Sequence, residues 1–138
     1  MSVFGTPSPS PQQQAQCPCG SAEPYLRCCG PLHAGRAQAP TAQALMRSRY
    51  SAFVQRRARY LLRTWHPRTR PETVQFPAGR WVGLSVLDTS GGGPSDEHGT
   101  VDYRATWLDV AGSAHDLIEH ARFERCEGNW VYLDGDVS

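Results

Sequence analysis

The segment from Cys17 to Gly30 reads CPCGSAEPYLRCCG and gathers four of the chain's five cysteines within thirteen residues. Cys17 and Cys19 flank one proline, and the adjacent pair Cys28 and Cys29 follows after eight residues. Structural zinc takes four ligands in a tetrahedron, and thiolates are common among them. A piece of this size cannot fold on hydrophobic burial alone. We therefore predict a zinc knuckle over residues 15–36 with the ligands Cys17, Cys19, Cys28 and Cys29.

The identity of the fourth ligand is open between Cys29 and His33, because imidazole also binds zinc. Two disulfides are the main alternative, but no export signal precedes the cysteines, and a bond between Cys28 and Cys29 would be strained. We therefore expect a cytoplasmic protein with reduced thiols. Four protein ligands leave no open coordination position, so the metal is expected to be structural. Cys126 stands alone and is expected to be a partly buried small hydrophobe.

The bulk composition indicates one small globular domain with an appendage. The chain has 138 residues, of which 39% are apolar. Residues 1–14 are rich in Pro, Ser and Gln and are predicted to form a disordered tail. No apolar run approaches the roughly 20 residues that span a bilayer, so we expect no membrane association.

A long amphipathic helix is predicted from Thr41 to His66. The hydroxyl of Thr41 can cap the first turn, and Pro67 disfavours helical geometry in the residue before it. A break is expected near 56–58, where arginines crowd the sequence. Apolar side chains recur at steps of three and four and predict one buried stripe, made of Met46, Tyr50, Phe53, Val54, Ala58, Leu61, Leu62 and Trp65. Four arginines are expected largely on the opposite side, namely Arg49, Arg56, Arg59 and Arg63.

The second half of the chain changes to a period of two. The alternation predicts strands over 82–86, 101–107, 117–123 and 130–133, with Glu119 interrupting the third. The breaks at Ala111-Gly-Ser and Glu127-Gly-Asn are short enough for antiparallel hairpins. A helical segment followed by a meandering antiparallel sheet is an α+β arrangement.

The charges divide the chain into two halves. All 14 basic residues are arginine; residues 24–71 hold ten of them and no acid, whereas residues 88–136 hold eleven of the thirteen acids. Internal pairing of the halves is the simpler expectation. The alternative is that the helix arginines at 56, 57, 59 and 63 bind an anionic partner such as RNA, although no RNA-binding motif is recognised.

Two sets of motifs resemble known proteins. The segment Cys17-Pro-Cys-Gly-Ser resembles the start of the SEC-C motif of the SecA tail, and Cys28-Cys-Gly, eight residues after Cys19, resembles its end. In that motif the fourth ligand is commonly His, at the position of Cys29. Three further segments are similar to the bacterial YchJ family: PTAQALMRSRYSAF from Pro40, TWHP from Thr64 and WVYLDG from Trp130. The resemblance covers about residues 15–135. It implies a SEC-C zinc knuckle over 15–36, and over 40–138 a cone-shaped, nuclear-transport-factor-like domain of helices packed in a curved antiparallel sheet.

That family has no established activity, so function is a choice between hypotheses. By its resemblance to the SecA tail, the knuckle is expected to be a protein-interaction module. A cone can also enclose a pocket, which makes a small-ligand-binding or catalytic domain the first alternative and RNA binding the second. Convergent polar groups in a hollow cone would favour the ligand-binding alternative. The large residues expected to line such a pocket are Tyr50, Trp65, Trp81, Tyr103 and Trp107.

Catalytic motifs are not recognised, so enzymatic activity is left open and no catalytic residue is assigned. His115 and His120 lie near Asp116 and Glu119 and could do acid–base chemistry. Residues 115 and 120 point to opposite faces of a regular strand, so they are expected not to share a site.

Overall fold

The computed structural model describes residues 15–138, and the predicted tail over 1–14 lies outside the described residues. Short helices come first: η2 (Tyr25–Arg27), α2 (Cys29–His33), α3 (Ala42–Val54) and α4 (Ala58–Arg63). Four strands follow: β1 (Arg80–Gly91), β2 (His98–Leu108), β3 (Ala114–Cys126) and β4 (Asn129–Val137). The predicted α+β class is confirmed. Between residues 15 and 138, no helix combines the length and the apolar character needed to cross a bilayer.

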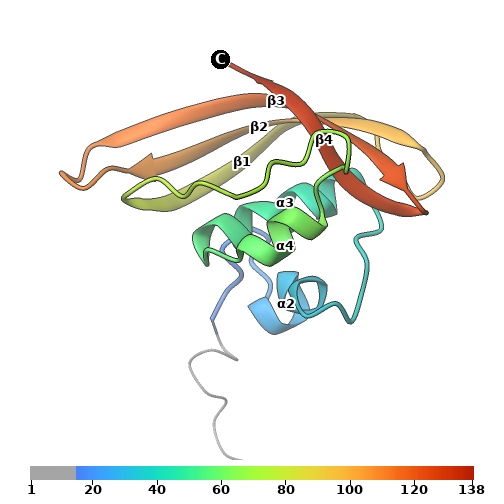
Figure 1. The fold of residues 1–138 in the computed structure, drawn as a ribbon. Helices are drawn as coiled ribbons and strands as arrows, with labels where there is room; N and C mark the ends of the chain where they lie inside the picture. Colours follow the sequence, from blue (N-terminus) through green and yellow to red (C-terminus); the bar gives the residue numbers. More distant parts are fainter. Residues whose placement is uncertain (1–14) are drawn as a thin grey trace, which may run out of the picture.

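The strands form one antiparallel meander in the order β1-β2-β3-β4. Each predicted strand is present and extends beyond its predicted bounds. The pairing shifts register between Trp81 and Gly83, between Val86 and Asp88, and between Arg122 and Phe123. Such bulges bend strands and increase their twist. The sheet accordingly curves over the helices (Figure 1).

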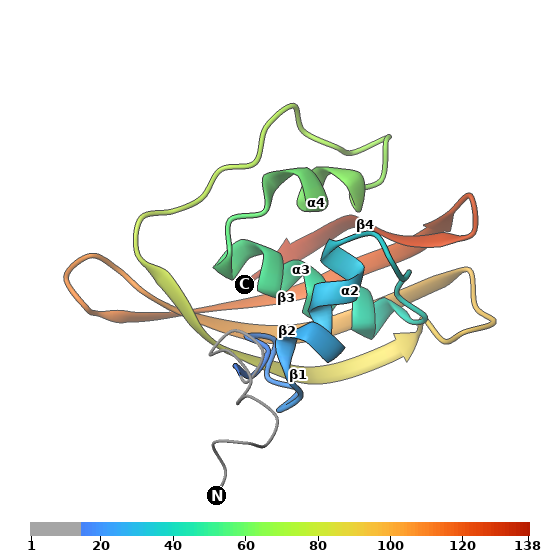
Figure 2. The ribbon, with the colours of Figure 1, turned by 90° about the horizontal axis from the view of Figure 1, so that it is seen from below.

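The helices cover one face of this sheet. Figure 1 shows α3 and α4 directly beneath the strands and α2 farther away, and Figure 2 shows α4 alongside α3. The N-terminus of α3 is capped as predicted, because the Ala44 amide donates to Thr41 Oγ1 at 3.0 Å. Leu45 and Met46 pack against the apolar face of the sheet around Val101 and Phe123. The core therefore lies between α3 and the strands.

The helical stretch ends earlier than predicted. The expected break is present, because α3 stops at Val54 and Arg56 takes a left-handed φ of 56°. The predicted end at His66 is wrong, because α4 stops at Arg63. The Tyr132 amide donates to the Thr64 carbonyl and the His66 amide donates to the Tyr132 carbonyl, both at 2.8 Å. The segment after α4 thus pairs with β4, and this pairing ends the helix before Pro67 is reached.

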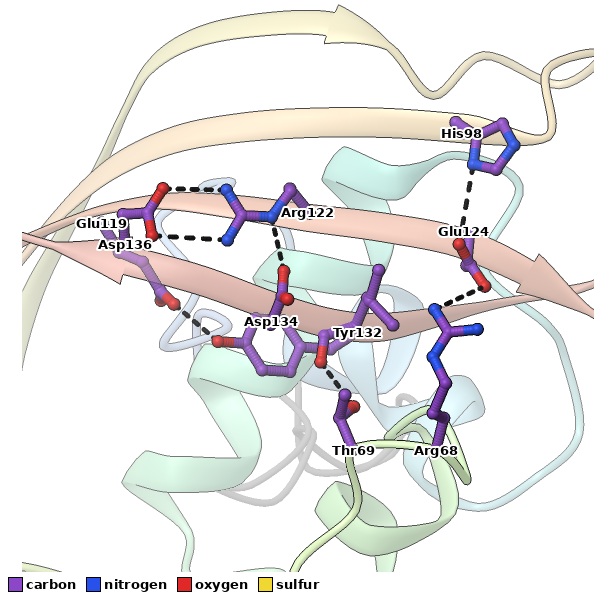
Figure 3. A network of polar contacts seen from close by, with 10 residues as sticks. Arg68, Thr69, His98, Glu119, Arg122, Glu124, Tyr132, Asp134 and Asp136 are labelled. Atoms are coloured by element: carbon purple, nitrogen blue, oxygen red, sulfur yellow. Dashed lines mark hydrogen bonds and ion pairs between the residues drawn. The ribbon is translucent and has the colours of Figure 1, made fainter.

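The expected pairing between the basic and acidic halves is wrong for the described residues. The sheet acids pair with arginines of the sheet itself: Arg122 donates to Asp136 at 2.8 Å and contacts Asp134 (Figure 3). Of the ten arginines within 24–71, only Arg68 comes within 4.0 Å of a carboxylate oxygen between residues 15 and 138, at 3.9 Å from Glu124. Apart from Arg68, the arginines within 24–71 therefore have no carboxylate partners among the described residues.

Candidate metal centre and ligand cavity

The sulfurs of Cys17, Cys19, Cys28 and Cys29 converge, and all lie within 4.8 Å of one another. The Cys19 and Cys28 sulfurs are 3.5 Å apart, and the Cys28 and Cys29 sulfurs are 4.0 Å apart. A tetrahedron with metal–sulfur bonds of about 2.3 Å has sulfur–sulfur edges of about 3.8 Å. The five cysteines of the chain are free thiols. The donor set and its dimensions therefore fit one tetrahedral metal ion.

Local backbone geometry brings the two cysteine pairs together. The Cys17 amide donates to the Glu23 carbonyl at 2.8 Å, which closes the turn after the first pair. Gly20 takes φ 82° in that turn, a conformation that side chains disfavour. The Cys28 amide then donates to the Tyr25 carbonyl at 3.0 Å, so the second pair follows a turn of 3-10 helix. The knuckle is thus formed by two tight turns that face each other.

His33, the alternative fourth ligand, makes other contacts. Its Nε2 lies 2.8 Å from the Ser48 carbonyl oxygen, and its Nδ1 lies 2.6 Å from the Tyr25 hydroxyl. A carbonyl only accepts, so Nε2 carries the proton and Nδ1 accepts from Tyr25. Burial lowers the pKa of His33, which favours this neutral form. Both ring nitrogens are therefore occupied, whereas the buried Cys29 sulfur belongs to the cluster.

The knuckle is set against α3. Cys17 Sγ lies 3.3 Å from Ser51 Oγ, and Arg47 donates to the Cys19 carbonyl at 2.7 Å. Three of the cysteines are almost completely buried. Burial raises the pKa of Cys28 to about 11, because a thiolate loses hydration there. A divalent cation would supply the opposite charge, and binding it would release protons from the thiols.

A cavity of about 420 Å³ lies on the other side of α3, between this helix and the sheet. Its volume is within the range of small-molecule sites. All five residues expected to line a pocket are on its wall: Tyr50, Trp65, Trp81, Tyr103 and Trp107. Apolar side chains make up most of the remaining wall: Met46, Phe53, Pro77, Ala105, Leu117, Ala121 and Phe123. The cone is hollow.

Three polar residues of this cavity were not predicted: Arg49, Glu119 and Tyr132. The expectation that Arg49 faces solvent is wrong, since only 6% of it is exposed. Its position gave the signal: residue 49 is three after Met46 and four before Phe53, on the buried stripe. Glu119 does not interrupt its strand but points inward with Leu117 and Ala121, as the period of two requires.

Glu119 is held by two tyrosines. Its carboxylate accepts a hydrogen bond from the Tyr103 hydroxyl. It accepts a second from the Tyr132 hydroxyl at 2.6 Å (Figure 3). Burial, reinforced by the charge of Glu119, raises the pKa of both tyrosines, so both stay protonated donors at neutral pH. Gly135 on β4 leaves room for this carboxylate, because a Cβ there would lie 2.0 Å from Glu119 Oε2.

Among the described residues, Arg49 is held through one guanidinium nitrogen, Nη1. Its Nη1 donates to the Leu61 carbonyl at 2.8 Å and to Thr64 Oγ1 at 2.7 Å. Its Cζ lies 4.9 Å from the ring centroids of both Trp65 and Tyr132. Burial lowers the pKa of Arg49 to about 10, which leaves the guanidinium charged at neutral pH. The cavity wall therefore carries one positive and one negative side chain.

The remaining candidates belong to neither site. His115 stacks on Trp107 with ring centroids 4.7 Å apart and contacts Asp109, whereas His120 pairs with Asp102. Cys126 is half-buried at the end of β3. Neither histidine lines the cavity, and the two do not share a site.

Comparisons with known proteins agree with this architecture. The family model described as the middle NTF2-like domain of YchJ matches residues 41–135. A UPF0225 protein of Streptomyces coelicolor is 56% identical over 121 residues, which cover 87% of this chain and 94% of that protein. A solution structure of a SEC-C motif containing protein from Rhodopseudomonas palustris aligns with a TM-score of 0.78 at 30% identity, covering 88% of this chain and 98% of that one. A crystal structure of a SEC-C motif containing protein from Psychrobacter arcticus gives 0.70 at 27% identity, covering 94% and 86%.

Proposed function

Since this chain belongs to the family defined by the middle NTF2-like domain of YchJ, we propose that its cone binds a small, largely apolar molecule. The supporting observation is the cavity of about 420 Å³, whose aromatic wall contains the buried polar groups of Arg49 and Glu119. Apolar pockets with a few convergent polar groups are typical of ligand sites. A cone needed only for stability would be filled by side chains, because unfilled volume is destabilising.

A cavity-filling variant tests this proposal. Ala105 is 2% exposed and lies on the cavity wall, so Ala105→Leu places three further carbons in the cavity. Ala114→Leu makes the same change at an exposed position and is the control. Titration calorimetry with 2-naphthamide, a neutral aromatic probe, should show saturable binding to the wild type and to Ala114→Leu. Ala105→Leu should bind at least about tenfold more weakly; equal affinity for all three proteins would place the probe elsewhere and contradict the proposal.

The knuckle has a structural role in this proposal. Cys17, Cys19, Cys28 and Cys29 would hold one Zn²⁺, which cross-links the two turns and contributes folding energy to residues 15–36. Elemental analysis should find one zinc per chain. Chelation should abolish amide protection over 15–36 while the strands keep theirs, and unchanged protection in the knuckle would contradict the role.

A second candidate is RNA binding, favoured by the arginines of the helical layer. Eight of them are exposed: Arg27, Arg36, Arg56, Arg57, Arg59, Arg63, Arg68 and Arg70. Among the residues that the structure describes, Arg68 is the only one of the eight near a carboxylate. Arg57 lies over the Tyr25 ring and Arg63 donates to the Leu32 carbonyl, so the knuckle adjoins this surface. Affinity for a single-stranded oligonucleotide should fall steeply with added salt, and Arg59→Gln should reduce that slope. Salt-independent or absent binding would exclude this candidate.

Two further expectations stay predictions. A protein partner for the knuckle follows from the resemblance to the SecA tail, and the exposed Leu26 of η2 is a contact that such a partner would use. A cytoplasmic location remains an expectation from the sequence.

A further inference from the structure

Building on the proposed ligand-binding role of the cavity, we infer that its ligand is a small aromatic molecule with one carboxylate, held by the free edge of Arg49. The inference joins three observations: an arginine buried in the cavity wall, the absence of a contacting carboxylate within the described residues, and an aromatic lining.

Arg49 has donors that the protein does not use. Within residues 15–138, its hydrogen bonds come from Nη1 alone, to Leu61 and Thr64. No fully buried side-chain nitrogen in that range lacks a partner, so Nε and Nη2 are open to the cavity. These two nitrogens form the edge of a guanidinium that binds a carboxylate with two parallel hydrogen bonds. The residue is only 6% exposed and lines the cavity, so we assign this edge to the cavity and not to the outer surface.

The charges limit the ligand to a single negative group. No carboxylate oxygen of residues 15–138 lies within 4.0 Å of the Arg49 nitrogens, although a buried guanidinium favours a direct partner. Glu119 is the one acid among the described residues of the wall, and both of its oxygens are engaged by Tyr103 and Tyr132. Its charge disfavours a phosphate dianion or a second carboxylate on the ligand, because the described wall has no cation besides Arg49 to pair with the extra charge.

The remaining wall selects an aromatic body. Trp81 and Trp107 lie with ring centroids 6.4 Å apart, and Tyr50 packs edge-on against Trp81 at 6.3 Å. Trp65 completes the aromatic surface beside Arg49. Aromatic rings prefer such offset and edge-on arrangements with one another. A planar ring in the cavity can contact these side chains while its carboxylate reaches Arg49.

Arg49 could instead have a purely structural role, in which it ties α3 to α4. Two variants distinguish this role from binding of the ligand carboxylate. Arg49→Met removes the free edge and the anchor together. Thr64→Val removes one acceptor of the anchor and leaves the free edge intact. The probes are 2-naphthoate and its neutral isostere 2-naphthamide, titrated calorimetrically at neutral pH.

The wild type and Thr64→Val should bind 2-naphthoate at least about tenfold more tightly than 2-naphthamide, the effect of a charge-assisted pair. In Arg49→Met this preference should vanish while 2-naphthamide affinity is retained. If Arg49→Met does not fold, the Arg49 Nε–H resonance of the wild type should shift with 2-naphthoate and not with 2-naphthamide. Equal affinities for the two probes, or a preference that survives in folded Arg49→Met, would overturn the inference and leave cavity binding intact. Binding of neither probe would overturn both.

Discussion

Gly135 on β4 provides a direct test of how the cavity holds its buried acid. Gly135→Ala adds one methyl group in the middle of a strand, opposite Ala121 in the register. The new Cβ would lie 2.0 Å from Glu119 Oε2 and 2.7 Å from its Cδ, closer than a Cβ can approach any atom. Glu119 must therefore move, because the clash involves its carboxylate and the backbone of β4 is held by pairing.

The size of the effect follows from the bonds that Glu119 loses. Two tyrosine hydroxyls donate to this carboxylate, and a hydrogen bond to a charged group contributes about 1.5–3 kcal/mol. Replacing glycine by alanine in a strand regains about 0.5–1 kcal/mol. Loss of both bonds at the lower value therefore reduces the free energy of unfolding by about 2 kcal/mol or more. For a chain of this length the melting temperature should fall by about 6 °C or more.

Urea unfolding followed by circular dichroism measures this difference, and two further variants interpret it. Gly83→Ala is the matched control, because a Cβ at Gly83 meets only Thr106 Cβ at 3.9 Å, and it should be neutral or slightly stabilising. Glu119→Ala removes the clash, so adding Gly135→Ala to it should cost little. A Gly135→Ala midpoint equal to the wild type, or costs that add fully in the double variant, would refute this account of Glu119.

Three further predictions concern the knuckle and the helix cap. Cys29→Ser should weaken zinc binding in a competition titration far more than His33→Ala, because both His33 nitrogens are hydrogen-bonded; the reverse ranking would make His33 the ligand. Since burial lowers the pKa of His33, its stabilising contribution should be complete above about pH 6.5 and lost as the pH falls through its folded pKa; ¹⁵N spectra at neutral pH should show a ring protonated at Nε2 alone, and a titration midpoint at or above about pH 6.5 would contradict this. Thr41→Ala should lower the free energy of unfolding by about 1 kcal/mol and Thr41→Ser should not, and equal losses in both variants would show that the cap is not the cause.

The features that depend on local periodicity were predictable from the sequence. The four strands and the cap at Thr41 follow from spacing, and the cysteine spacing identifies the cluster. The end of α4 was not predictable, because it depends on pairing of Thr64 and His66 with Tyr132, far away in the chain. Arg49 departs from the expectation for an arginine, because its helical position places it on the buried stripe although arginine is usually exposed. The hollow of the cone depends on how large side chains pack across several elements, which no local pattern contains.

The two sites are connected through α3, which lies between them. The Ser51 hydroxyl and the Ser48 backbone carbonyl face the knuckle, where they contact Cys17 and His33. Arg49 and Phe53 of the same helix line the cavity. A rigid helix cannot shift on one side without moving its other side, so a metal bound by the four cysteines would help to fix the position of the Arg49 guanidinium. We expect removal of the metal to weaken binding of 2-naphthoate even though the strands stay folded. The reason is that Nε and Nη2 of Arg49 can bind the carboxylate together only when the guanidinium is correctly placed.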